Sequence, residues 1–69
     1  MTGIRKKQKE NVIQLLQEID KCETEEEIEK LDERAEIMVQ LGQLTKKAYL
    51  FIEEAMDDRI LTLVEEGKI

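Results

Sequence analysis

The chain of 69 residues contains a single cysteine, Cys22, and no histidine, which leaves it few ways to stabilise a fold. One cysteine cannot form an internal disulfide, and a structural zinc site requires several cysteine or histidine ligands. In a chain of this size a single apolar core supplies only about 3–5 kcal/mol. The sequence therefore predicts a fold that depends on close helix packing, on self-association or on a bound partner.

The composition favours helices over strands. Charged residues make up 41% of the chain and hydrophobic residues another 41%, and proline is absent. No apolar run approaches the roughly 20 residues that a membrane span needs, and no signal-peptide core is visible. We therefore expect a single helical domain over residues 1–69, in a reducing cytoplasmic setting and with no membrane contact.

Basic residues are concentrated at the start of the chain, where positions 1–9 hold four of the eleven. Positions 10–69 hold the other seven, together with all seventeen acidic residues. An acidic surface is repelled by the phosphate backbone, so we expect no direct sequence-specific binding of nucleic acid. Residues 1–6 are predicted to form a flexible basic arm that promotes solubility.

Apolar residues recur at three- and four-residue steps in three segments, which predicts three helices. The first helix is expected over residues 6–21, and the third over residues 46–66. The stripe of the first helix consists of Val12, Leu15, Leu16, Ile19 and Cys22. The second helix carries a seam with coiled-coil spacing, formed by Ile28, Leu31, Ala35 and Met38. Short connections between the helices indicate an all-α three-helix hairpin or small bundle.

The predicted helix boundaries carry recognisable end signals. Thr24 and Glu27 form a capping box, in which the hydroxyl accepts from the third helical N–H and the carboxylate reaches back to the cap N–H. Gly42 supplies the left-handed residue that commonly ends a helix, and Thr45 can cap the next one. These signals place one connection at residues 22–24 and a second one between the helix end at Gly42 and the cap at Thr45.

Residues suited to catalysis are scarce. Histidine, the side chain used most often in general acid–base and nucleophilic sites, is absent. Cys22 has no histidine to form its thiolate, and Lys21 with the second helix N-terminus would lower its pKa only modestly. We expect Cys22 to be a small buried apolar residue. The sequence predicts a protein that is not an enzyme and that needs no cofactor or metal.

The third helix has more apolar residues than one core-facing stripe requires. Its expected core-facing arc consists of Tyr49, Ile52, Ala55, Met56, Ile60 and Leu63. A second face carries Leu50, Leu61 and Val64 together with the acids Glu53 and Asp57. An apolar face interleaved with acids indicates either a surface that becomes dry when a basic partner binds or a solvated acidic face with scattered exposed leucines.

Arg59 falls inside the core-facing arc of the third helix, where no acid of its own helix can pair with it. Burial of an unpaired guanidinium is costly. We therefore expect Arg59 to be a structural residue that pairs with a carboxylate from the first helix, the second helix or another chain. The alternative is that its aliphatic stem packs on the core while its guanidinium extends into solvent.

Two stretches of the sequence resemble a known family. The first is Leu16-x-x-Ile19-x-Lys21-Cys22-x-Thr24, followed by Ile28-Glu29-Lys30, and the second is Leu44-Thr45 leading without a gap to Ala55-x-Asp57-x-Arg59-Ile60-x-x-Leu63. Together they are similar to the Hha/YmoA family of small enterobacterial regulators, which modulate virulence and haemolysin expression. The predicted second helix is longer here than in the family pattern.

The resemblance implies a four-helix or truncated three-helix fold that binds the dimerisation region of a histone-like nucleoid-structuring silencer. In that family the aspartate of the Ala-x-Asp-x-Arg motif faces partner arginines, which assigns the partner contact to Asp57. Arg59 and Cys22 are then structural residues. The family modulates gene silencing without reading base sequence itself.

Three functional hypotheses follow. The first is a cytoplasmic adaptor that modulates transcription by docking the second face of its third helix onto a basic partner protein. The second is a small acidic inhibitor from a phage or mobile element, which would block a nucleic-acid-binding or enzyme site with acids of the second and third helices. The third is a helical-hairpin dimer in which the seam of the second helix pairs with its copy.

Overall fold

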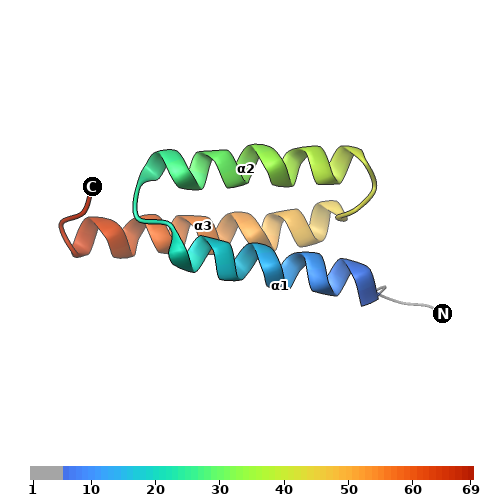
Figure 1. Cartoon of the computed structure of the whole chain (residues 1–69), viewed down its shortest axis with the longest axis horizontal. Coiled ribbons are helices and arrows are strands. Elements are labelled where there is room, and N and C mark those ends of the chain that lie inside the picture. The colour runs from blue at the N-terminus through green and yellow to red at the C-terminus, as the bar shows by residue number, and fades with distance from the viewer. Residues whose placement is uncertain (1–5) are drawn as a thin grey trace.

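The computed structural model describes residues 6–69 and contains three helices joined by two short connections (Figure 1). Helix α1 spans Lys6–Lys21, α2 spans Glu25–Gln40 and α3 spans Lys46–Glu65. The predicted all-α three-helix bundle is confirmed. Residues 1–5, which make up most of the predicted basic arm, lie outside the described residues, and the last residue of that arm, Lys6, begins α1.

The three helices form an elongated bundle of 45 × 18 × 16 Å in which each helix packs against the other two. The chain reverses direction at each connection, so α1 and α3 run parallel and begin at the same end, with α2 antiparallel to both (Figure 1). Among the described helices, none combines the length and apolar character required to cross a membrane.

One apolar core joins the three helices. Leu15 of α1 and Ile52 and Leu63 of α3 are the largest fully buried side chains. The complete core consists of Leu15, Ile19, Cys22, Ile28, Leu31, Ala35, Leu44, Ile52, Met56 and Leu63. Full burial of one leucine or isoleucine side chain contributes about 1.5–3 kcal/mol, so these residues supply the main stabilisation of the bundle.

The apolar seam of α2 is used inside the single chain. Ile28, Leu31 and Ala35 are buried in the core, and Met38 packs against it. Helices α1 and α3 therefore already cover the surface that the hairpin-dimer hypothesis assigned to a second copy. In this structure the seam is not free for self-association, because a dimer through it would have to displace its intramolecular partners.

The connection between α1 and α2 contains the predicted cap with one change. The Thr24 hydroxyl accepts a hydrogen bond from the Glu27 amide at 3.1 Å, as the sequence indicates. The Glu27 carboxylate accepts from the amide of Glu23 at 2.8 Å, one residue before the expected donor, Thr24. The capping box therefore fixes the backbone at Glu23, before the cap residue, as well as the first turn of α2.

Helices α2 and α3 end in the same way. Gly42 adopts a φ of +79°, and the amides of Gly42 and Gln43 donate to the carbonyls of Val39 and Met38. This pair of bonds is a Schellman motif, whose left-handed residue is usually glycine. At the end of α3 the φ of Gly67 is +77°, and the amides of residues 67 and 68 repeat the pattern.

Replacement of Thr24 by alanine removes the acceptor at the N-terminus of α2. We expect the Thr24→Ala variant to lose about 1 kcal/mol of unfolding free energy, measured by urea denaturation followed by circular dichroism. Thr62→Ala is the control, because the Thr62 hydroxyl donates to the Asp58 carbonyl inside α3 and caps no helix end. Equal losses in the two variants would show that the Thr24 cap has no special role.

Candidate protein-binding surface

Leu50, Leu61 and Val64 lie on the outside of α3 and are 58%, 61% and 51% exposed. Asp57 is also exposed, and Glu53 is partly exposed. Residues 50, 57, 61 and 64 are separated by seven, four and three positions, so they follow one side of the helix. We call Leu50, Asp57, Leu61 and Val64 the outer stripe.

Beside the outer stripe, an acidic groove of about 150 Å³ runs between α2 and α3. Its floor contains Ile28, Met56 and Ile60. The carboxylates that line it are Glu25, Glu29 and Asp32 from α2 and Glu53 and Asp57 from α3. No lysine or arginine is among the lining residues. The fold thus brings acids of two helices to one side, and Asp57 belongs to both the groove and the outer stripe.

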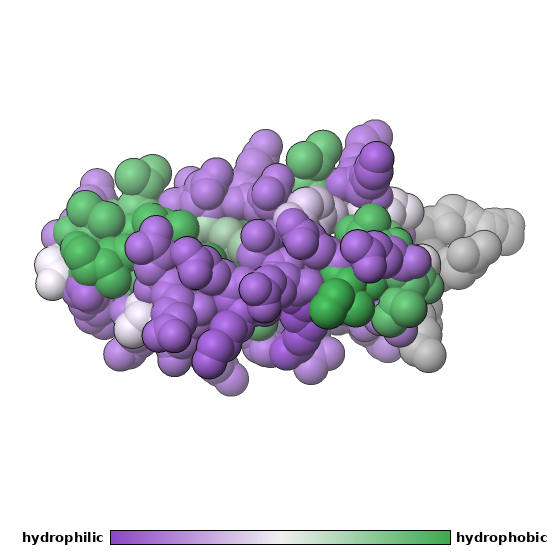
Figure 2. Space-filling view, turned by 90° about the horizontal axis from the view of Figure 1, so that it is seen from above, coloured by the Kyte–Doolittle hydropathy of each residue, from purple (hydrophilic) through white to green (hydrophobic). Residues whose placement is uncertain are grey.

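Figure 2 shows the face of the bundle on which α2 lies. Hydrophilic side chains cover the middle of this face, and hydrophobic side chains gather toward the two ends of the long axis (Figure 2).

Tyr49 ties α3 to the acidic side of α2. Its hydroxyl lies 2.7 Å from a carboxylate oxygen of Asp32 and 3.2 Å from one of Glu36, and it donates to this pair. Burial, the hydrogen bond to Asp32 and the neighbouring negative charges all raise the pKa of Tyr49. The phenol therefore stays protonated and keeps the Asp32 carboxylate fixed at the rim of the acidic groove.

Arg59 satisfies its charge differently from the sequence-based expectation. Its Nε donates to the backbone carbonyl of Cys22 at 3.0 Å, and no carboxylate of residues 6–69 forms an ion pair with it. Cys22 directly follows α1, where unpaired carbonyls and the negative end of the helix dipole attract a cation. The expected carboxylate of the first or second helix is therefore not found, because the C-terminus of α1 supplies the counter-charge.

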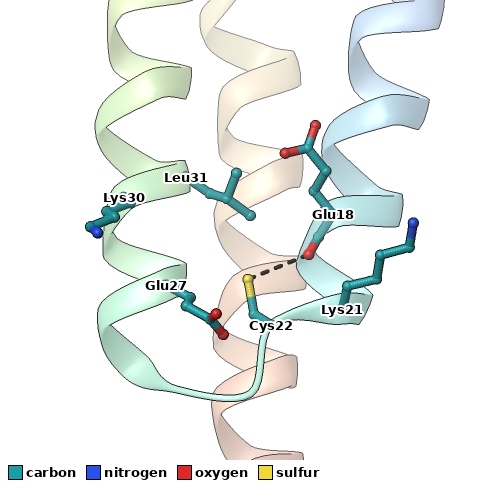
Figure 3. Close-up of a pocket in the computed structure, with 6 residues that line it drawn as sticks. All are labelled: Glu18, Lys21, Cys22, Glu27, Lys30 and Leu31. Atoms are coloured by element: carbon teal, nitrogen blue, oxygen red, sulfur yellow. Dashed lines mark hydrogen bonds between the residues drawn. The ribbon is translucent and has the colours of Figure 1, made fainter.

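Cys22 is buried, as predicted, beside a pocket of about 410 Å³ (Figure 3). Its Sγ donates to the Glu18 carbonyl at 3.4 Å. Burial, and secondarily the Glu27 carboxylate, raise the pKa of the Cys22 thiol, with Arg59 acting in the opposite direction. The expected modest lowering by Lys21 and the α2 N-terminus is therefore not found, and the thiol remains protonated at neutral pH.

A further surface was not predicted. An open groove of about 640 Å³ lies between the first two turns of α1 and of α3, where Ile13 and Phe51 are 52% and 55% exposed. Its lining consists of Gln8, Lys9, Val12, Ile13, Thr45, Lys47, Ala48 and Phe51. We call it the apolar groove. The sequence feature that could have indicated this groove is that Ile13 and Phe51 fall outside the core stripes of their helices.

Residues 6–69 thus form a three-helix bundle with three candidate surfaces. These are the outer stripe, which is apolar with one acid, the acidic groove, and the apolar groove with its basic residues. Within this range no three cysteine, aspartate or glutamate side chains converge in a way that could hold a metal ion. Comparison of the chain with models of known families, with curated proteins and with solved structures gave no match.

The raised pKa of Tyr49 predicts a loss of stability at alkaline pH. In the unfolded chain a tyrosine ionises near pH 10, whereas the folded chain keeps Tyr49 protonated to higher pH. The stability that Tyr49 contributes is therefore fully present below pH 10 and is lost as the pH rises further, because there the unfolded state releases the proton while the folded state keeps it.

Tyr49 is the only tyrosine and the chain has no tryptophan, so phenolate absorbance reports this residue alone. We expect its titration midpoint to lie well above 10 in the folded protein and near 10 in denaturant. The Tyr49→Phe variant should lose less unfolding free energy between neutral and alkaline pH than the wild type. A folded-state midpoint near 10 would contradict the hydrogen bond to Asp32.

Proposed function

We propose that this chain is a non-enzymatic, cytoplasmic regulator that binds a protein with a basic surface through its outer stripe and acidic groove. The observation that carries the proposal is the arrangement at Asp57. This exposed carboxylate stands between exposed leucines on one side and four further acids on the other. Lysine or arginine side chains of a partner would enter the acidic groove while apolar side chains cover Leu50 and Leu61.

The electrostatic arrangement supports a basic partner over a neutral one. Like charges gathered along one groove repel each other, and a cationic partner converts that repulsion into attraction. Leu50, Leu61 and Val64 are each more than half exposed and lie beside these acids. Their burial on binding would add apolar contact at about 25 cal/mol per Å² of surface removed from water.

The proposal that the partner is a transcriptional silencer rests on the resemblance to the Hha/YmoA family. By this resemblance Asp57 corresponds to the family's partner-facing aspartate, and it is one of the four residues of the outer stripe. We therefore propose that the chain modulates transcription by binding the dimerisation region of a histone-like nucleoid-structuring protein, without contacting bases.

Charge reversal at Asp57 tests the site. We expect Asp57→Lys to weaken binding to the purified silencer dimerisation region by at least about 30-fold, because a lysine would face partner cations. Binding is measured by isothermal titration calorimetry and folding by circular dichroism. Glu33→Lys makes the same change of charge at an exposed position of α2 that does not line the acidic groove.

The control variant should bind within about threefold of the wild type, an effect of long-range charge alone. Equal weakening in both variants would mean that net charge, and not the outer stripe, determines binding. If the silencer does not bind the wild type, partners are captured from the native host with wild-type and Asp57→Lys protein. A basic protein captured by the wild type alone would show that the surface is right and the partner is a different one.

A second candidate function, inhibition of a nucleic-acid-binding protein, is favoured by the acids that α2 contributes to the acidic groove. Glu25, Glu29 and Asp32 extend the negative surface across two helices, and an inhibitor that masks a nucleic-acid-binding cleft needs such a continuous acidic face. The two functions predict different results when this chain and DNA compete for the captured partner. An inhibitor and DNA would exclude each other from the captured partner, whereas a transcriptional adaptor would bind the partner while the partner holds DNA.

A further inference from the structure

The apolar groove combines exposed hydrophobic side chains with positive charge. Lys9 and Lys47 are exposed at its rim, and no carboxylate is among the residues that line it. Neither α1 nor α3 has an acidic residue in its first turn. The positive ends of two parallel helix dipoles therefore add to the two lysines. A complementary occupant presents apolar side chains together with carboxylates.

The outer stripe of the same chain has this chemistry. Leu50, Leu61 and Val64 are exposed on one side of a 20-residue helix, with Asp57 among them. We infer that the apolar groove of one copy receives the outer stripe of a second copy. A helix side that packs into a groove between two other helices is a recurring mode of protein recognition.

Like charges disfavour the symmetric alternatives. Two apolar grooves placed face to face would bring Lys9 and Lys47 against their own copies, and two outer stripes would oppose their carboxylates. Only the pairing of groove with stripe joins opposite charges and also covers Phe51 and Leu61. This contact is heterologous, because each copy uses a different surface from its neighbour.

The two surfaces can be occupied at the same time. Successive residues of a helix point about 100° apart, so Phe51 and Leu50 face different sides of α3. A copy that receives a neighbour in its groove therefore still offers its own stripe to the next copy. The predicted product is a ring or an open chain of copies, which forms as concentration rises and dissociates as salt screens the charges.

Sedimentation equilibrium of the purified chain tests the inference. At low salt the average mass should rise above that of the monomer between micromolar and millimolar concentration, and it should fall again at high salt. We expect Phe51→Ser in the groove and Leu61→Ser in the stripe each to weaken association at least about tenfold. Ile37→Ser is the matched control, since Ile37 is 53% exposed on α2 and lines neither surface.

Mixing the two variants tests whether the contact joins the outer stripe of one copy to the apolar groove of another. The Phe51→Ser chain keeps an intact stripe and the Leu61→Ser chain keeps an intact groove, so an equimolar mixture should form dimers and nothing larger. A wild-type protein that stays monomeric up to millimolar concentration would overturn the inference. It would also be overturned if the mixture stayed monomeric, or if Ile37→Ser were as defective as Phe51→Ser.

This inference shares the outer stripe with the proposed function, but it alone requires the apolar groove. Phe51→Ser should therefore abolish self-association and leave binding to the silencer unchanged. If self-association is absent while Asp57→Lys still prevents partner binding, only the present inference fails. If the chain self-associates but binds no basic protein, only the proposed function fails.

Discussion

The structure depends on one constraint: three short helices share a single narrow core, and each can direct only one side into it. The core is filled by ten residues, of which Leu15, Ile52 and Leu63 are the largest that are fully buried. A bundle 16–18 Å across has no room for a second apolar layer. Every apolar side chain on another side of α3 must therefore face outward, which places Leu50, Leu61 and Val64 on the surface together.

Polar contacts at the helix boundaries fix how the surfaces are presented. Arg59 holds the end of α1 against α3 through the Cys22 carbonyl, and Tyr49 holds α3 against α2 through Asp32. Because these contacts position α2 beside α3, acids that are distant in sequence line one groove. The same packing places the first turns of α1 and α3 side by side, which creates the apolar groove and brings Lys9 near Lys47. The surfaces that carry the functional proposals thus follow from the packing of the core.

Much of the fold could be predicted from the sequence because its signals are local. Helical periodicity, the Thr24 cap and the left-handed glycine at Gly42 each act within a few residues. Residues on one helix, such as those of the outer stripe, could be grouped for the same reason. The partner of Arg59 and the tether of Tyr49 could not, because they depend on which helix lies opposite. The apolar groove is likewise formed by two helices and is apparent only once α1 and α3 are known to run parallel.

In the single chain the outer stripe of α3 stays in contact with water, while the opposite side of the same helix is buried in the core. Paramagnetic relaxation by a soluble gadolinium chelate, measured on methyl-labelled protein at a dilution where copies are separate, tests this most directly. We expect strong relaxation enhancement for the methyl groups of Leu50, Leu61 and Val64, and almost none for those of Ile52 and Leu63. Equal protection of both sets would show that the outer stripe is buried in the single chain and would remove the binding surface proposed for Asp57 and its neighbours.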